Sequence, residues 1–397
     1  MGTFGNIYDL CDNRTIKIVP NKLLRKRLEI KIRSLPHGGI KKLSENIKVS
    51  YITLWRDLRN KTAIPLEIFK ELKINIPQNI WFESGPNRNR VKLPRKITAE
   101  LSSIIGAYMV DGHLRERKTT WNKNKNAMHY EFIIREEYKS IIDSFSNWFS
   151  KTFFVNILPK DRKNHYEFYI SNKVIFLYFT KILELKNGRK TETTYVPEYI
   201  KSANKNIKKS FLQGIYMFDG GVDYRTAYVN LITRSFTLFQ EVQPLLHAIG
   251  IMPDYCSKKP DKYGRWKIRI RKKEKLKLCL KLFEKGTEKW FRIMEHLYGL
   301  NQSKSLNRVK KQKTLEGFID EIDRLYPRKR WNSVTFSDVI RIVARNENIG
   351  INDISHELKR GKTVVYEYVR KLEKWGIFSS TTKNNQRVYT IHENWRK

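Results

Sequence analysis

The sequence predicts an α+β fold in which two pseudo-symmetric αββαββα units form the middle of the chain, with a small basic unit on either side. Two observations lead to this prediction. One nine-residue pattern occurs at residues 104–112 and again at 212–220, and helix and strand patterns follow each copy in the same order. In addition, 40% of the 397 residues are hydrophobic and 12% are aromatic, which is enough to build several cores.

The charge balance predicts an anionic partner. Lys and Arg number 79 against 40 Asp and Glu, a formal net charge of +39, and nucleic acid is the simplest partner for such a field. No stretch approaches ~18 consecutive apolar residues, so we expect no membrane span. The N-terminus lacks the pattern of a secretion signal, and Cys11, Cys256 and Cys279 form no CxxC pair. We therefore expect a cytoplasmic, nucleoid-associated protein without disulfides.

The N-terminal region predicts a helical unit. Residues 1–34 form a basic segment whose helix pattern at 22–33 fits either a solvated face or phosphate contact. In residues 35–92, a helix pattern at 40–47 precedes a short break, and Ser50 can cap a second helix that ends at Arg59. This segment resembles repressor-type helix–turn–helix units, although a plain helical hairpin is the alternative. The resemblance implies DNA contacts from Ser50, Tyr51, Thr53 and Arg56. The composition of residues 76–97, rich in Pro, Asn and Arg, predicts a linker.

The C-terminal region predicts a second small unit. Residues 301–332 form a basic linker with one amphipathic stretch. In residues 333–397, three helix patterns precede two strand patterns joined by a polar turn, and this order resembles a winged helix. The resemblance implies DNA contacts from Lys362, Tyr366 and Arg370, and dimerisation is the alternative role.

The central region, residues 93–300, contains repeats at about 98–190 and 205–297. Both copies read Gly-x-Tyr-Met-x-Asp-Gly, and they end in Asp111-Gly112 and Asp219-Gly220. Helix patterns at 140–149 and 237–248 follow, and patterns at 173–185 and 274–283 close the units. The motif aspartates lie 108 residues apart, whereas Tyr166 and Trp266 lie 100 apart, because residues 121–128 are inserted in the first unit.

The duplicated motif predicts a metal site. Two apolar helices that pack closely need small residues at their crossing, and Gly106, Ala107 and Gly214 provide them. Their C-terminal ends would then bring Asp111 and Asp219 together, where two carboxylates repel unless a cation or proton lies between them. Oxygen ligands favour Mg²⁺, with Mn²⁺ as an alternative. Simple capping is the other interpretation, but an acid is poorly placed at a helix C-terminus.

These two units resemble the LAGLIDADG homing endonucleases in their single-chain, two-motif form, over roughly residues 98–300. The resemblance implies a saddle that binds double-stranded DNA. It also implies that Asp111 and Asp219, at the eighth motif position, each serve one strand, with the carbonyls of Val110 and Phe218 completing the coordination. The sixth position, often acidic in the family, is Met109 or Met217 here, which affects packing rather than metal binding.

The resemblance further implies a catalytic cation near the last strand pair of each repeat. We select Lys163 and Lys262, with Lys160, Arg162, Lys258 and Arg265 as alternatives. A basic turn that only contacts phosphate is the simpler interpretation. Base recognition would come from the open strand faces, where the polar residues are Arg115, Arg117, Arg225, Tyr228, Asn230 and Arg234.

We therefore expect a site-specific homing endonuclease that makes metal-dependent double-strand breaks by phosphodiester hydrolysis. A transcription regulator on a disabled core is one alternative, but such a core usually loses an acid and both are present. A maturase that binds intron RNA is another. Both half-sites lie in one chain, so we expect a monomer. The chain begins with Met1 and ends without a His-Asn pair, so we expect a free-standing protein rather than an intein.

Overall fold

Two apolar helices, α5 (Ala99–Val110) and α9 (Lys205–Phe218), pack against each other at the centre of the protein. Small residues make this contact possible. A Cβ atom on Gly106 would lie 2.1 Å from the carbonyl oxygen of Phe211, and one on Gly214 would lie 2.0 Å from that of Ser103. The buried hydroxyl of Ser102 donates to the carbonyl of Ile207 at 2.8 Å, which ties the two helices together.

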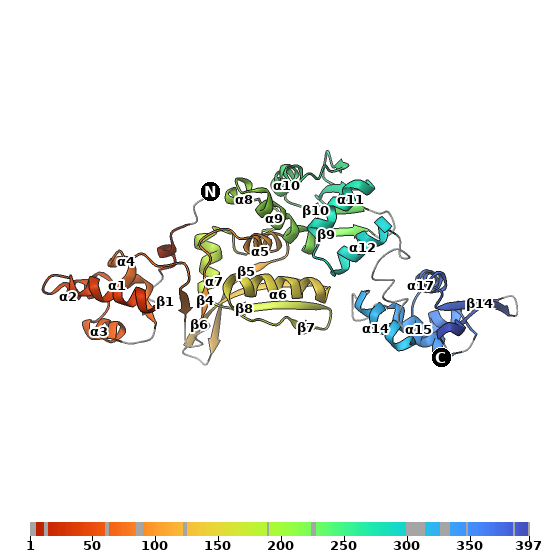
Figure 1. Cartoon of the computed structure of the whole chain (residues 1–397), viewed down its shortest axis with the longest axis horizontal. Coiled ribbons are helices and arrows are strands. Elements are labelled where there is room, and N and C mark those ends of the chain that lie inside the picture. The colour runs from red at the N-terminus through yellow and green to blue at the C-terminus, as the bar shows by residue number, and fades with distance from the viewer. Residues whose placement is uncertain are drawn as a thin grey trace.

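The computed structural model describes residues 5–11, 15–59, 63–84, 90–121, 125–188, 190–223, 228–298, 314–325, 334–346, 348–383 and 386–395 (Figure 1). It confirms the α+β class. None of the helices within these ranges is both long and apolar enough to cross a membrane.

The first half of the central region continues from α5 into a four-stranded antiparallel sheet. Its elements are β5 (His113–Trp121), β6 (Lys125–Glu136), α6 (Lys139–Phe153), β7 (Lys160–Arg162), β8 (His165–Ser171) and α7 (Lys173–Leu177). The strand order is β5-β6-β8-β7. The closing helix is shorter than the predicted 173–185, because the chain widens into a π-helical turn at Tyr178–Ile182. This turn places the ring of Phe179 5.9 Å from the rings of both Tyr108 and Phe153.

The second half has the same order of elements. After α9 come β9 (Gly220–Asp223), β10 (Tyr228–Thr233), α10 (Phe236–Ala248), β11 (Tyr255–Cys256), β12 (Trp266–Ile270) and α11 (Lys273–Cys279). The strand order is β11-β12-β10-β9, again antiparallel. The predicted helix at 274–283 ends in a 3-10 turn at Leu280–Leu282. A short helix, α8 (Glu198–Lys201), precedes α9.

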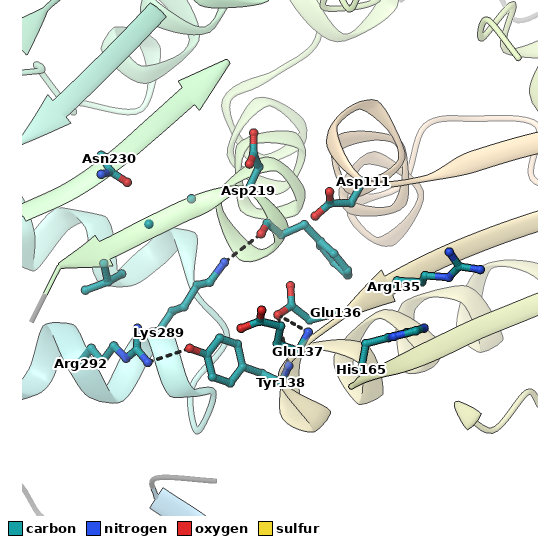
Figure 2. Close-up of a pocket in the computed structure, with 14 residues that line it drawn as sticks. Asp111, Arg135, Glu136, Glu137, Tyr138, His165, Asp219, Asn230, Lys289 and Arg292 are labelled. Atoms are coloured by element: carbon teal, nitrogen blue, oxygen red, sulfur yellow. Dashed lines mark hydrogen bonds between the residues drawn. The ribbon is translucent and has the colours of Figure 1, made fainter. Parts of the chain in front are cut away.

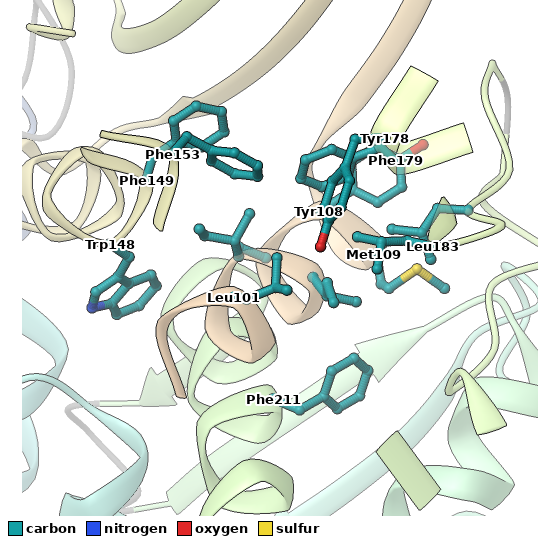
Figure 3. Packing of buried hydrophobic residues seen from close by; sticks show 14 of the residues in the cluster. Leu101, Tyr108, Met109, Trp148, Phe149, Phe153, Tyr178, Phe179, Leu183 and Phe211 are labelled. Carbon is teal, nitrogen blue, oxygen red and sulfur yellow. The ribbon is translucent and has the colours of Figure 1, made fainter. Parts of the chain in front are cut away.

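Each sheet has one apolar face and one charged face. In the first sheet Leu114, Phe132 and Phe168 are fully buried, and the Phe132 ring lies 6.0 Å from that of Phe145 in α6. Figure 3 shows the neighbouring part of this core, including the aromatic side chains of α6. Since successive strand residues point to opposite faces, Arg115 of β5 lies on the open face of the sheet.

The N-terminal unit is a mixed helix and sheet layer. It comprises η1 (Ile7–Leu10), β1 (Ile16–Val19), α1 (Lys22–Arg33), α2 (Gly39–Asn46), α3 (Tyr51–Arg59), β2 (Ile64–Pro65), α4 (Leu66–Glu71), β3 (Trp81–Ser84) and β4 (Val91–Lys92). The helices α2 and α3 occupy the positions predicted from the sequence. The predicted linker at 76–97 is wrong in part, because β3 and β4 lie within it and β3 pairs with β1 along its whole length. Phe82 of β3 is buried in a core that continues into the central region.

The C-terminal unit has a core of its own. After α12 (Glu288–Tyr298), it comprises α14 (Leu315–Leu325), α15 (Phe336–Arg345), β13 (Ile349–Gly350), α16 (Ile351–Glu357), α17 (Lys362–Lys374), β14 (Phe378–Lys383), β15 (Gln386–Ile391) and η5 (Glu393–Trp395). The amphipathic stretch predicted inside the basic linker is α14, and its Phe318 and Ile322 belong to this second core. The linker therefore contributes part of the C-terminal unit.

Candidate functional site

The two motif aspartates end the two central helices. Asp111 is the C-cap of α5 and Asp219 is the C-cap of α9, and both have αR backbone angles. Their amides donate to the carbonyls of Ala107 at 3.0 Å and Ile215 at 2.9 Å. Because the helices pack side by side, their ends are adjacent and both acids line the same cavities (Figure 2). The structure therefore brings the two predicted acids together.

Their surroundings disfavour two negative charges. Both side chains are exposed to solvent at the cavities, but the protein around them still desolvates their carboxyl groups. This desolvation raises the pKa of Asp219 to about 7, the neighbouring Asp111 adds to the shift, and Lys289 opposes it. Desolvation also raises the pKa of Asp111, against the opposing effects of Lys289 and Lys190. A bound cation would relieve this repulsion.

Two buried lysines hold the helix ends. Lys190 is 9% exposed and Lys289 is 6% exposed. The Lys190 ammonium donates to the carbonyls of Tyr108 and Gly112 around the end of α5. The Lys289 ammonium donates to the carbonyls of Met217 at 2.6 Å and Phe218 at 3.0 Å at the end of α9. Each lysine thus places its ammonium group on carbonyls at a helix C-terminus beside an aspartate, and the Tyr108 carbonyl also accepts from the Gly112 amide at 3.1 Å.

Burial also lowers the pKa values of both lysines. It lowers the pKa of Lys190 to about 8, although Asp111 acts in the opposite direction. Burial lowers the pKa of Lys289 as well, and this effect exceeds the raising effects of Glu136, Asp111 and Asp219.

Two cavities flank the acid pair. The first, of about 700 Å³, is lined by Asp111 and Asp219 together with Lys289, and it reaches the open faces of both sheets at Arg135 and Asn230. The second, of about 560 Å³, is lined by the same two acids together with Lys190 and Arg234. Each cavity therefore has both aspartates and one of the two buried lysines.

A third carboxylate occurs in one half. Glu136 ends β6 and lines the first cavity, and its Oε1 accepts from the amides of Glu137 at 2.8 Å and Tyr138 at 3.2 Å. Burial raises the pKa of Glu136 to about 7, with Lys289 opposing the shift. The strand registers pair Leu114 with Phe132 and Val222 with Val229. Thr233 is consequently the counterpart of Glu136 in the second half.

The donor set fits a hard cation that also takes ligands from outside the protein. Among the described residues, no group of three or more His, Cys, Asp or Glu side chains is arranged to hold a metal ion. Two carboxylates with raised pKa values supply oxygen ligands of the kind that Mg²⁺ binds. Of the two carbonyls predicted as ligands, that of Phe218 already accepts from Lys289, and Val110 lines the second cavity.

The predicted catalytic cations lie elsewhere. Lys163 is exposed in the turn between β7 and β8, and Lys262 is exposed in the loop between β11 and β12. Neither residue lines the cavities beside the acids, whereas Lys289 lines the first cavity and Lys190 the second. In the sequence, a glycine stands shortly before each lysine, and in the structure both Gly188 and Gly286 have positive φ.

The predicted DNA-binding residues lie on several surfaces. Arg115 and Arg117 lie on the open face of the first sheet beside Glu131, and Tyr228 and Asn230 lie on that of the second. Arg234 lines the second cavity, whereas Arg225 lies outside the described residues.

In the flanking units, several of the predicted contacts are exposed on helices. The exposed members are Tyr51, Arg56, Lys362, Tyr366 and Arg370. Ser50 accepts from the Thr53 amide at 3.2 Å, and the two hydroxyls are 2.7 Å apart. Ser50 therefore caps α3, and its hydroxyl donates to that of Thr53.

No protein-family model matches the sequence. Among curated proteins, the chain is 26% identical over 238 residues to glutamine–fructose-6-phosphate aminotransferase from Methanocaldococcus jannaschii, covering 57% of this chain and 20% of that enzyme. It is 25% identical over 171 residues to a DNA polymerase from Thermococcus hydrothermalis, covering 43% of this chain and 9% of the polymerase. The chain thus spans a fifth or less of the length of these relatives.

Among solved structures, the chain is similar to LAGLIDADG homing endonucleases. I-DmoI is 18% identical, with 46% of this chain and 94% of that chain covered at a TM-score of 0.35. I-GzeII, solved with its DNA target, is 11% identical, with 60% and 100% covered at a TM-score of 0.36. The full-length DUF199/WhiA protein from Thermatoga maritima is also similar, 11% identical, with 70% and 90% covered at 0.30.

Proposed function

We propose that the chain is a site-specific DNA endonuclease of the LAGLIDADG homing type, which hydrolyses one phosphodiester bond in each strand of a duplex with the help of divalent cations. The observation that carries this proposal is the pair of helix-end aspartates, each beside a buried lysine, between two open basic sheet faces. Retention of both acids favours cleavage over a purely regulatory role.

The residues of the site have complementary roles in this reaction. Mg²⁺ held by Asp111 and Asp219 would activate water and stabilise the leaving oxygen. Lys190 and Lys289 stay bonded to helix carbonyls and place an ammonium group in each cavity, where it stabilises negative charge on a phosphate. Glu136 is fixed by two backbone amides and can hold a water molecule in the first cavity.

The duplex would lie across the open faces of the two sheets. The first cavity is bordered by Arg135 and His165 of one sheet and by Gly221 and Asn230 of the other, so both faces meet at the acid pair. A net charge of +39 would attract the phosphate backbone over the whole length of the site.

The flanking units would extend the contact beyond the central site. We assign α2 and α3 to a helix–turn–helix unit that contacts DNA through Tyr51 and Arg56, and the C-terminal unit to a winged helix. On α17, Lys362, Tyr366 and Arg370 are exposed, whereas Val365 and Val369 are buried on the other side. These units would add affinity to a monomer that already contains both halves of the cleavage site.

Incubation with Mg²⁺ and DNA from the genomic region around its own gene tests this proposal. We expect specific double-strand cuts, and we expect Asp111→Asn and Asp219→Asn to lower the rate by about 10³-fold or more while DNA binding persists. Asp143→Asn is the matched control, because Asp143 is an exposed acid that pairs with Lys139 on α6. Tight sequence-specific binding without cleavage in Mg²⁺ or Mn²⁺ would contradict the proposal.

A further inference from the structure

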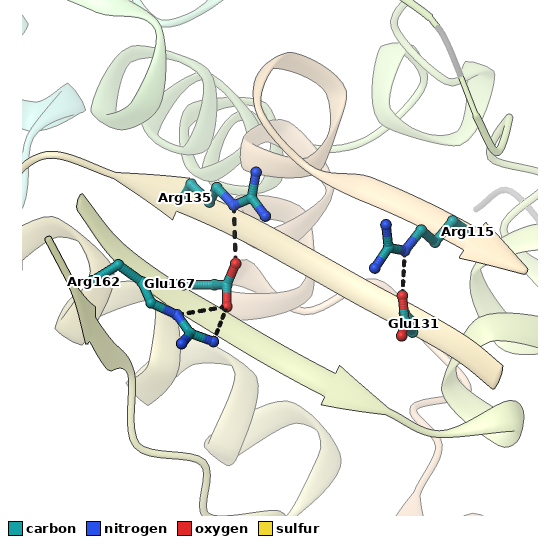
Figure 4. Close-up of polar contacts among 5 residues, drawn as sticks. All are labelled: Arg115, Glu131, Arg135, Arg162 and Glu167. Carbon is teal, nitrogen blue, oxygen red and sulfur yellow. Dashed lines mark hydrogen bonds and ion pairs between the residues drawn. The ribbon is translucent and has the colours of Figure 1, made fainter. Parts of the chain in front are cut away.

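Two carboxylates lie beneath arginines on the open face of the first sheet (Figure 4). The side chain of Glu131 is 1% exposed and that of Glu167 is 8% exposed. Their arginine partners are much more open, with Arg115 at 41% and Arg135 at 60%. A buried acid on the open face of a sheet is unusual, and here its effect is to fix the positively charged groups above it.

Each carboxylate has several donors. Glu131 accepts from Nε of Arg115 and from the Tyr169 hydroxyl at 3.0 Å. Glu167 accepts from Nε of Arg135 at 2.9 Å and, on its other oxygen, from Nε and Nη2 of Arg162 at 3.2 and 2.9 Å.

These contacts keep both acids ionised. Burial alone would raise the pKa of Glu131 and of Glu167, but the hydrogen bonds from their arginines, and for Glu131 also from the Tyr169 hydroxyl, outweigh it and lower both pKa values.

The nitrogen atoms that each arginine uses in these contacts determine which of its N–H groups remain available to a ligand. Arg115 and Arg135 are held through Nε, so the outer edge formed by Nη1 and Nη2 is directed away from the carboxylate. That edge matches the O6 and N7 acceptors of guanine in the major groove. Arg162 instead donates to Glu167 from both Nε and Nη2, so its role is to hold this carboxylate in place. A guanidinium that is already fixed loses less conformational freedom on binding.

Arg265, directly before β12, contacts Asp261 through Nε and Nη2, both at 3.0 Å, but two other arginines of the second half are held by aromatic rings. Arg269 lies over the rings of Tyr228 at 5.2 Å and Tyr255 at 5.6 Å, and Arg271 lies 5.8 Å from the Tyr228 ring. Stacking on a ring fixes the plane of a guanidinium but does not reserve one edge for a base. The two sheet faces therefore differ in the kind of contact they are prepared to make.

We propose that the half of the DNA site beneath the first sheet contains two guanines, read by Arg135 and Arg115, an inference that rests on the proposed function. Arg135 lies four residues beyond Glu131 along β6, and Arg115 lies opposite Glu131. Four strand residues span about 13 Å, or about four base-pair steps along the groove. Arg135 also lines the cavity of the acids, so its guanine is the one nearer the cut.

Selection of binding sites by the full-length protein from random duplexes, with Ca²⁺ in place of Mg²⁺, tests this inference. We expect two enriched guanines about four base pairs apart in one half of the selected site. Arg135→Gln should remove the preference at the inner position and Arg115→Gln at the outer, each by about 5- to 150-fold against other bases. Arg162→Gln and Arg269→Gln are the controls, and neither should remove a guanine preference.

A variant of Glu131 tests whether this residue positions Arg115 or only supports the fold. Glu131→Gln keeps the shape of the side chain but removes the charge that holds Arg115, so guanine preference at the outer position should fall while total DNA affinity does not. A selected site without these guanines, or an equal loss of affinity for all sequences in both arginine variants, would overturn the inference alone. Enrichment of no sequence at all would overturn the proposed function, and this inference with it.

Discussion

The two cavities beside Asp111 and Asp219 share both acids but differ in the other charges that line them. The first includes the carboxyl groups of Glu136 and Glu137 as well as Lys289. In the second, among the described residues, the charged groups other than the shared aspartates are basic, and they include Lys190 and Arg234.

This difference teaches that the repeated fold determines where the acids meet, whereas single positions determine the charge of each half. Glu136 and Thr233 occupy equivalent places in the strand registers, yet only one can carry a charge. An added carboxylate strengthens the attraction of a cavity for cations and weakens its attraction for phosphate.

The largest effect, on stability, is expected at the contact between the two central helices, to which each half contributes one helix. Gly106→Ala and Gly214→Ala would each place a Cβ about 2 Å from a backbone carbonyl oxygen of the other helix. The helices must then separate, and we expect a loss of about 3 kcal/mol or more in the free energy of unfolding. Denaturant unfolding measures this loss.

A matched glycine provides the control for this prediction. Gly361→Ala should change stability little, because nothing lies within 4 Å of its added Cβ and its φ is negative. Equal stability of all three variants would mean that the helices do not pack this closely.

The next largest effect, on the cleavage of each DNA strand, is expected from the two buried lysines. Lys190→Met and Lys289→Met each remove the ammonium from one cavity, and under the proposed function each should slow cleavage of one strand by about 10²- to 10³-fold. Duplexes labelled separately on each strand report the two nicking rates. Lys289→Met should also impair cleavage at lower pH more than Lys190→Met does, because Lys289 opposes the raised pKa values of both Asp219 and Glu136.

The exposed lysines serve as controls for this pair. Lys163→Met and Lys262→Met should leave both nicking rates within a few-fold of the wild-type rates, because these side chains lie in exposed turns. Their loss should reduce the salt dependence of DNA binding by at most about one phosphate contact each. A hundredfold loss of cleavage in either control would instead favour the catalytic role that the sequence predicts for Lys163 and Lys262.

The sequence contains enough to predict the acids but not the lysines. Asp111 and Asp219 follow duplicated helices whose glycines require close packing, so local pattern and repetition together place them. Lys190 and Lys289 reach the helix ends from segments that follow the closing helix of each repeat. Their path depends on tertiary packing, and no local periodicity encodes it.

The sequence also did not predict the strands within residues 76–97, for a related reason. β3 has four residues and its partner β1 lies more than 60 residues earlier, so pairing rather than sequence pattern defines it. The neighbouring Pro77 and Asn79 are typical of loops, which is why residues 76–97 read as a linker. The helix α14 is another such case, because its apolar side chains find their partners in the C-terminal core.

The smallest effect concerns pH and metal ions. The pKa values of Asp219 and Glu136 are about 7 in the folded protein, against 3.8 and 4.5 as ordinary values. The folded state thus keeps protons that the unfolded chain releases, so these groups make the protein less stable as pH rises from about 4 to about 7. Metal binding needs the ionised acids. Mg²⁺ should therefore raise Tm little at pH 5 and by a few degrees at pH 8.

Variants assign this pH dependence to the two halves. Asp219→Asn should abolish the Mg²⁺-dependent rise in Tm at pH 8. Glu136→Gln should reduce the loss of metal-free stability between about pH 4 and pH 7, whereas Thr233→Ser, the matched change in the second half, should not alter it. Thermal unfolding with and without Mg²⁺ over this pH range measures both effects. A rise in Tm that is equal at pH 5 and pH 8 would mean that the ion binds away from the acid pair, since carboxylates with these pKa values bind Mg²⁺ only after they lose their protons.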